Sequence, residues 1–360
     1  MNIWFDDRIF TIQQYGGISR YYTELAAGLL AEGQQVRIDA PLHINRYIGE
    51  LPCHHGTVLP YFRGVTALCQ RANGIFEGSR LRAFAPHIVH ETYFRTQAPD
   101  AGGARRVLTV YDMIHERFAD PAGKDALSQA RRAAVQRSDH VICISRNTRK
   151  DLIEFFGVDE ARTSVIHLAA SLLPESGLAR PLDAPYLLYV GPRGRYKNFA
   201  CLLKAYAALP EVMGEYTLLC VGGGALTAGE LDMMQRLHIP QDHVRQISGD
   251  DRRLTACYQH AAAFVYPSLY EGFGIPPLEA MQCGCPVICS NSSSLPEVVG
   301  DAALSFDPQC PESLAAALGK ILYDPALAES FVHKGRMRAA EFSWPHCVSQ
   351  TMKLYRELTG

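Results

Sequence analysis

The chain has 360 residues, of which 48% are apolar and 20% are charged. This length suits two domains of roughly 150–200 residues each, and the composition excludes a disordered chain. Lys and Arg total 35 against 37 Asp and Glu, whereas a dedicated nucleic-acid-binding protein is usually basic, so no nucleic-acid partner is expected.

The eleven cysteines include no C-x-x-C pair, and many lie in apolar runs such as 141–144. This pattern favours small buried thiols in a reducing cytoplasm over a zinc cluster or a disulfide framework. The first ten residues, MNIWFDDRIF, lack the basic and apolar regions of a signal peptide. No run approaches the ~18 apolar residues of a membrane span, so we expect a cytoplasmic protein that could at most lie on a membrane surface.

The first half of the chain alternates short apolar strands with helical or polar segments. Helical spacing of apolar residues extends from Ile18 to Leu29. The alternation predicts a parallel sheet covered by helices on both faces. The strand candidates lie at 2–5, 36–40, 87–90, 106–111 and 140–145.

The alternation stops at 172–185, where three prolines indicate a linker, and then restarts. We therefore expect an N-terminal domain at 1–172 and a C-terminal domain at 173–345. A last helix within 346–360 follows Pro345 and could pack on either domain, including back on the first. Strand candidates of the second half lie at 186–190, 216–221, 263–266, 286–289 and 303–306.

The most informative segment is 266–286, which reads YPSLYEGFGIPPLEAMQCGCP and leads from a strand into a helix. Gly272 and Gly274 allow backbone N–H groups to approach a ligand closely. The helix N-terminus that follows favours a phosphate or a sugar hydroxyl. Glu271 in the loop and Glu279 about two turns along the helix could reach two parts of one elongated ligand. The alternative is a capping acid and a surface residue.

A second motif, YVGPRGRYKNF, follows the first strand of the C-terminal half. Arg193, Arg195 and Lys197 place three cations within five residues at the strand's carboxyl end, where doubly wound domains bind ligands. Cations there suit a diphosphate, whose charge grows when it departs as a leaving group. A solvated basic loop is the alternative.

Glycines also precede a helix near the N-terminus, in QYGGISRYY. Gly16 and Gly17 suggest a dinucleotide site, and Asp39 has about the spacing of a ribose-binding acid. The loop is GGxxR rather than GxGxxG, however, so a plain structural turn remains an alternative.

Histidines follow two of the predicted strands. His115 lies in TVYDMIHERF and His90 in IVHETYFR. From its spacing alone, His115 could equally be an ordinary surface residue. We expect His90 to be structural or to face an acceptor. No D-x-D metal signature occurs in the chain, which predicts a site without metal.

The segment 266–286 resembles the retaining glycosyltransferases of family four, whose E-x7-E signature corresponds here to Glu271 and Glu279. The resemblance extends over 138–152, 186–199 and 283–308. It implies the GT-B fold, in which two Rossmann-like doubly wound α/β domains face a central cleft and the C-terminal domain binds a nucleotide sugar.

The resemblance also implies roles for individual residues. Glu279 would bind the donor ribose and Glu271 a sugar hydroxyl, while Lys197 and Arg193 hold the diphosphate. Arg195 competes with Arg193 for that role. The remaining expected donor and sugar contacts are Gly16, Gly17, His115, Gly272, Phe273 and Gly274.

The expected reaction is metal-free transfer of a hexose with retention, by same-face attack, onto a saccharide or lipid-linked saccharide. The motifs look most like bacterial mannosyltransferases of surface-polysaccharide assembly, which implies GDP-mannose as substrate and no cofactor. The alternatives are a UDP- or dTDP-sugar donor, or an epimerase or hydrolase of nucleotide sugars. A nicotinamide-dependent oxidoreductase is disfavoured because the glycine fingerprint fails.

The stretch 61–84 combines aromatic residues with four arginines, at positions 63, 71, 80 and 82. It predicts either a solvated helical face or peripheral contact with anionic lipid, on the cytoplasmic face of the inner membrane.

Overall fold

The computed structural model describes residues 1–118 and 126–360. It divides into two compact units, one formed by Met1–Leu168 with Trp344–Gly360 and the other by Ala169–Ser343. The boundaries expected from the sequence, at residues 172 and 345, lie close to these divisions.

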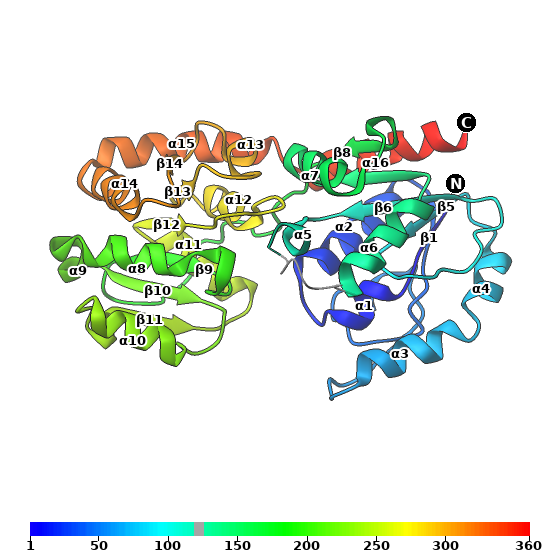
Figure 1. Ribbon diagram of the computed structural model, residues 1–360, viewed down its shortest axis with the longest axis horizontal. Helices are drawn as coiled ribbons and strands as arrows, with labels where there is room; N and C mark the ends of the chain where they lie inside the picture. Colours follow the sequence, from blue (N-terminus) through cyan, green and yellow to red (C-terminus); the bar gives the residue numbers. More distant parts are fainter. Residues whose placement is uncertain (119–125) are drawn as a thin grey trace. The chain divides into compact units, whose positions relative to one another are not determined.

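The first unit contains a six-stranded parallel sheet in the order β2-β1-β5-β6-β7-β8. Four of its strands, β1, β5, β6 and β8, are labelled in Figure 1. Its central strands are buried along their whole length, as apolar parallel strands must be when helices cover both faces. The elements of this unit are β1 (Asn2–Phe5), α1 (Arg8–Ile12), α2 (Gly17–Ala31), β2 (Gln35–Ile38), β3 (Leu42–His43), β4 (Thr57–Val58), α3 (Val65–Gly74), α4 (Glu77–Phe84), β5 (Ile88–Glu91), β6 (Arg105–Val110), α5 (Ile114–Phe118), α6 (Ala126–Arg137), β7 (His140–Cys143), α7 (Arg146–Phe156), β8 (Thr163–Val165) and α16 (Trp344–Thr359).

The second unit repeats this plan with a parallel sheet in the order β11-β10-β9-β12-β13-β14. The fold class predicted from the alternation, two Rossmann-like α/β domains, is confirmed. The elements are β9 (Tyr186–Val190), α8 (Phe199–Ala207), α9 (Pro210–Glu215), β10 (Thr217–Val221), α10 (Ala228–Arg236), β11 (Val244–Ile247), α11 (Asp251–His260), β12 (Ala263–Tyr266), α12 (Ile275–Gln282), β13 (Val287–Ser290), α13 (Leu295–Val299), β14 (Leu304–Phe306), α14 (Pro311–Tyr323) and α15 (Pro325–Ala340).

The last helix, α16, packs on α2 of the first unit. Its Tyr355 hydroxyl lies 2.6 Å from Nδ1 of His90, whose Nε2 lies 2.8 Å from the Thr109 hydroxyl. Burial lowers the pKa of His90 to about 3. His90 is therefore a neutral core residue that ties the end of the chain to β5 and β6, in accord with the structural role considered for it.

The cysteines are all free thiols, and ten of the eleven are buried. The expectation of buried thiols is thus confirmed for every cysteine except Cys310, which is half-buried.

Candidate active site

The loop between β12 and α12 carries Glu271 and is shaped by Gly274. Gly274 has φ +124°, and a Cβ there would lie 2.8 Å from Cδ2 of Leu295. The glycine is therefore required both by the backbone conformation and by the close approach of α13. Phe273 beside it is buried with its ring 5.8 Å from that of Phe342, so its side chain belongs to the core.

Lys197 and Glu271 form an ion pair across two loops of the second unit. Lys197 Nζ lies 2.7 Å from Glu271 Oε1 and 3.2 Å from the hydroxyl of Tyr266. The two charged side chains are only 13% and 10% exposed. The structure thus brings together the cation motif after β9 and the acid motif after β12, at the same edge of the sheet.

The two loops are also joined through the backbone. The Leu269 N–H donates to the Tyr196 carbonyl at 2.7 Å. Asn198, in the left-handed conformation with φ +56°, donates its amide to the carbonyls of Pro267 and Pro308 at 3.0 and 2.8 Å. Asn198 therefore fixes the position of Lys197 against the acidic loop, a role that the sequence reasoning missed.

Arg193 does not take the position expected of a diphosphate ligand. Its guanidinium donates to the carbonyls of Gly222, Gly224 and Ala225 at 3.1, 2.8 and 2.8 Å, and pairs with Glu230 at 2.9 Å. The side chain is 2% exposed. Arg193 is turned into the protein, where it holds the loop after β10 through the carbonyl groups of that loop.

Arg195 is the exposed arginine of the same loop. It adopts φ +50°, and within the described residues its guanidinium makes no hydrogen bond or ion pair. Of the two arginines that the sequence left in competition, Arg195 is the one whose charge is available to a ligand.

Glu279 lies on α12, two turns after Glu271, and is half-buried. It accepts a hydrogen bond of 3.1 Å from the hydroxyl of Tyr258 on α11. The two glutamates thus have separate protein contacts, one with a cation and one with a buried tyrosine.

The candidate residues of the first unit lie on short elements near the start of the chain and after β6. Gly16 precedes α2, and a Cβ there would lie 2.4 Å from Oε1 of Gln13, which accepts from the Ser19 N–H. Gly17 begins α2, and His115 lies exposed on α5. The close contact with Gln13 indicates that a glycine is needed at position 16 for packing.

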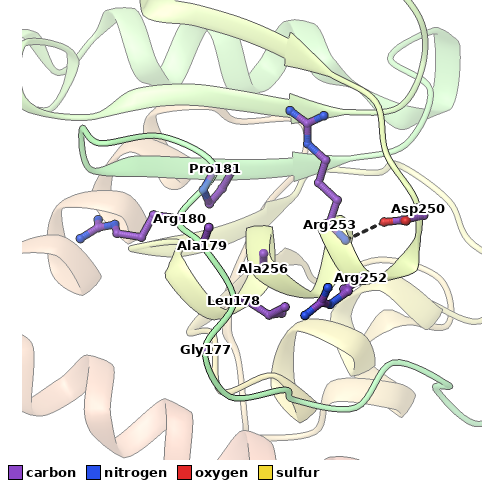
Figure 2. A pocket seen from close by; sticks show the side chains of 9 residues that line it. All are labelled: Gly177, Leu178, Ala179, Arg180, Pro181, Asp250, Arg252, Arg253 and Ala256. Carbon is purple, nitrogen blue, oxygen red and sulfur yellow. Dashed lines mark hydrogen bonds between the residues drawn. The ribbon is translucent and has the colours of Figure 1, made fainter.

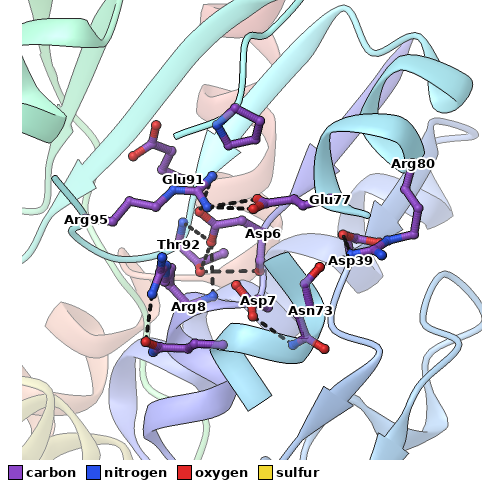
Figure 3. Close-up of polar contacts among 12 residues, drawn as sticks. Asp6, Asp7, Arg8, Asp39, Asn73, Glu77, Arg80, Glu91, Thr92 and Arg95 are labelled. Atoms are coloured by element: carbon purple, nitrogen blue, oxygen red, sulfur yellow. Dashed lines mark hydrogen bonds and ion pairs between the residues drawn. The ribbon is translucent and has the colours of Figure 1, made fainter. Parts of the chain in front are cut away.

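Asp39 provides no ribose-binding carboxylate. Both of its oxygens accept from Arg80 at 2.8 Å (Figure 3). Arg37 lies 3.5 Å from one of them. The dinucleotide interpretation therefore has no carboxylate to bind the ribose. Because Arg80 is paired with the buried Asp39, its charge does not contribute to the surface predicted to contact lipid.

A buried polar cluster next to Asp39 occupies the carboxyl ends of β1 and β5 (Figure 3). Asp7 accepts from Asn73 at 2.7 Å, and Arg95 bridges Glu77 at 2.8 Å and Asp6 at 3.5 Å. Burial, together with the charge of Asp6, raises the pKa of Asp7 to about 7. These groups largely neutralise one another, so the cluster secures α3 and α4 against the sheet.

A pocket of about 570 Å³ lies in the second unit, between the linker and α11, and Figure 2 shows the side chains that line it. None of the residues predicted for the site lines it, and Arg252 at its rim pairs with Glu175 at 2.7 Å. The lining residues are Gly177, Leu178, Ala179, Arg180, Pro181, Asp250, Arg252, Arg253 and Ala256.

The described residues lack two kinds of feature. In residues 1–118 and 126–360, no three His, Cys, Asp or Glu side chains are grouped so that they could hold a metal ion. Over the same residues, no helix is long and apolar enough to cross a bilayer.

Comparison with known proteins assigns the family. The model described as "Glycosyl transferases group 1" matches residues 175–338, and the one described as "Glycosyltransferase Family 4" matches residues 15–171. A glycogen synthase of Mycobacterium tuberculosis is 30% identical over 295 residues, which cover 76% of this chain and 69% of that protein. This chain belongs to glycosyltransferase family 4. It is therefore a glycosyltransferase, as the E-x7-E resemblance predicted.

Further relatives of this family 4 member cover nearly its whole length. The O-antigen chain mannosyltransferase B of Escherichia coli is 29% identical over 370 residues, which cover 95% of this chain and 96% of that protein. Among solved structures, the sucrose-phosphate synthase of Thermosynechococcus elongatus has a TM-score of 0.75 at 23% identity, covering 99% and 98% of the two chains. WaaG, a glycosyltransferase involved in lipopolysaccharide biosynthesis, has a TM-score of 0.72 at 16% identity, covering 98% and 99%. The fold is GT-B.

Proposed function

We propose that this glycosyltransferase transfers mannose from GDP-mannose to a saccharide or a lipid-linked saccharide, with retention and without a metal ion. The single observation that carries the proposal is the Lys197–Glu271 ion pair at the carboxyl edge of the second sheet. The similarity to the O-antigen mannosyltransferase of E. coli supports mannose as the transferred sugar.

The paired charges suggest how the donor is received. When the donor diphosphate reaches the loop, its oxygens compete for the Lys197 ammonium, and exposed Arg195 adds a second cation. Glu271 is then released to accept a hydrogen bond from a sugar hydroxyl, with Tyr266 as a remaining neighbour of Lys197. The ion pair therefore keeps the Lys197 ammonium and the Glu271 carboxylate oriented before the donor binds.

The transfer step uses these cations to stabilise the leaving group. The bond between the sugar C1 and the diphosphate oxygen breaks, and the acceptor oxygen forms its bond to C1 on the same face. The acceptor proton passes to the departing phosphate oxygen, so atoms and charge balance without a protein nucleophile. Lys197 and Arg195 would supply the electrostatic stabilisation that a divalent cation supplies elsewhere.

The experiment is a donor panel with purified enzyme. We expect GDP release from GDP-mannose in the presence of acceptor, with no comparable release of UDP or dTDP from their hexose conjugates. UDP or dTDP release would select the alternative donors, and a product in which the sugar is epimerised or freed to water would select an epimerase or hydrolase.

We further propose that residues 58–76 contact the cytoplasmic face of the inner membrane, where a lipid-linked acceptor would lie. This segment contains two arginines and no Asp or Glu. Arg63 and Arg71 are exposed, and each basic residue near an anionic surface contributes ~1 kcal/mol. Large apolar side chains of the same segment are also exposed, at 42–70%; they are Val58, Tyr61, Phe62, Leu68, Ile75 and Phe76.

Vesicle co-sedimentation tests this contact. We expect binding to anionic vesicles and not to neutral ones, weakened by salt and by Arg63→Gln with Arg71→Gln. Arg356→Gln, which removes an exposed charge from α16, is the matched control and should leave binding unchanged. Equal pelleting with both lipids, or with neither, contradicts the proposal.

A further inference from the structure

A run of serines after β13 lies against the loop that carries Glu271. The Ser290 hydroxyl donates to the Ser268 carbonyl at 2.5 Å, and the Ser292 hydroxyl donates to the Leu269 carbonyl at 2.9 Å. β13 is the neighbour of β12 in the sheet, so the turn that follows one strand supports the loop that follows the other.

The next two serines hold the backbone of Glu271 itself. The Glu271 N–H donates to the Ser293 hydroxyl at 2.8 Å, while the Ser294 hydroxyl lies 2.9 Å from the Glu271 carbonyl and 2.7 Å from that of Phe273. Ser294 is completely buried. Both polar backbone groups of Glu271 are therefore fixed by side chains of the turn between β13 and α13.

Ser293 is held in an unfavourable backbone conformation. Its φ is +53°, in the left-handed region that glycine adopts freely and other residues adopt at a cost. A glycine at position 293 would relieve that cost but would leave the Glu271 N–H without its acceptor. Strain of this kind persists where the surroundings require a particular group, and the group supplied here is a hydroxyl.

We propose that Ser293 and Ser294 are positioning residues that hold the Glu271 carboxylate against Lys197. The proposal rests on the role of Glu271 in transfer proposed above. The serines act on the backbone of Glu271, so their effect is on the orientation of its carboxylate and not on the binding of the nucleotide.

The test uses the two substitutions Ser293→Gly and Ser293→Ala. Both remove the hydroxyl, but glycine relieves the backbone strain and alanine keeps it. If the hydroxyl positions Glu271, kcat for GDP release from GDP-mannose falls about ten-fold in both variants. The Kd for GDP stays unchanged, and Ser293→Gly melts no lower than Ser293→Ala. Ser294→Ala should lower kcat in the same way.

The control is Ser313→Ala, since the Ser313 hydroxyl also accepts a backbone N–H, that of Asp307 at 3.2 Å, but lies at the start of α14. It should leave kcat unchanged. The proposal is overturned if Ser293→Gly has the kcat of the wild type and activity is lost only in the less stable variants. The serines would then have a purely structural role.

Glu271→Gln, measured in parallel, separates this inference from the proposed function. Normal turnover in Glu271→Gln contradicts the role of Glu271 itself. Low turnover in Glu271→Gln together with normal turnover in both Ser293 variants contradicts only the positioning role.

Discussion

Removing the positive charge of Lys197 should lower both stability and activity, and the two effects can be separated. Lys197→Met keeps the length of the side chain but leaves the Glu271 carboxylate nearly buried without its cation. Breaking a buried pair by removing one member costs about 3–5 kcal/mol. Because the two side chains are 13% and 10% exposed, and Tyr266 stays nearby, we expect the lower end, about 3 kcal/mol.

This cost can be read from thermal unfolding of the second unit. For a unit of its size, a loss of about 3 kcal/mol corresponds to a fall in Tm of roughly 6–12 °C. The double variant Lys197→Met/Glu271→Gln removes both charges and should recover most of that loss, since a neutral pair is tolerated where a lone charge is not. Turnover should stay low in the single and the double variants alike.

The control is Lys334→Met. Lys334 Nζ lies 2.8 Å from Asp301 Oδ2, much as in the Lys197 pair, but these side chains are 46% and 86% exposed. Its loss should leave stability nearly unchanged, because solvent screens an exposed pair. Equal effects of Lys197→Met and Lys334→Met, or additive losses in the double variant, would refute the view that the Lys197–Glu271 pair is energetically coupled.

Three other outcomes are expected. Arg195→Ala should lower turnover about 10²–10³-fold and weaken GDP binding. Arg193→Ala should instead lower Tm, because Arg193 holds the carbonyls after β10. Kinetics, GDP titration and melting of both variants test which arginine binds the diphosphate. The pKa of Asp7, raised to about 7, means that the folded state holds a proton between about pH 4 and 7 that the unfolded state has lost. Stability should therefore fall as pH rises through this window, and Asp7→Asn should reduce the difference in stability between pH 5 and pH 8 by up to roughly 3 kcal/mol, measured by urea unfolding at these two pH values. Turnover should persist in excess EDTA; complete loss that Mg²⁺ or Mn²⁺ restores contradicts the metal-free reaction.

The fold and the positions of the two site loops could be predicted because their signals are local. The strands β9 and β12 are short apolar runs, and each is followed at once by a loop that carries candidate residues. Parallel strands bring their carboxyl ends to one edge, which is why the two loops meet, but the ion pair between Lys197 and Glu271 was not among the expectations from the sequence. The edge strands β8 and β11 were missed, because they are short and only partly buried, which weakens their apolar pattern.

The orientation of Arg193 could not be predicted, because it depends on carbonyl groups about thirty residues further along the chain. Nothing in the spacing of YVGPRGRYKNF distinguishes an arginine turned inward from one turned outward. The serines that hold Glu271 did leave a signal: SNSSS directly follows a buried strand, at the same sheet edge as the acidic loop. Hydroxyl side chains at that point are suited to bind the backbone of a neighbouring loop.

The packing of α16 on the first unit has a consequence for how the chain is made. The ribosome releases the N-terminal segment first, yet His90 receives the Tyr355 hydroxyl only when the last residues emerge, 265 positions later. The second unit, Ala169–Ser343, is continuous and can complete its core during translation. At about 5–20 residues per second, the first unit must remain unfinished for many seconds after its sheet-forming residues have left the exit tunnel. Nascent chains stalled before residue 344 should consequently expose the apolar face of α2 to chaperones, although the strands of both six-stranded sheets have already been synthesised.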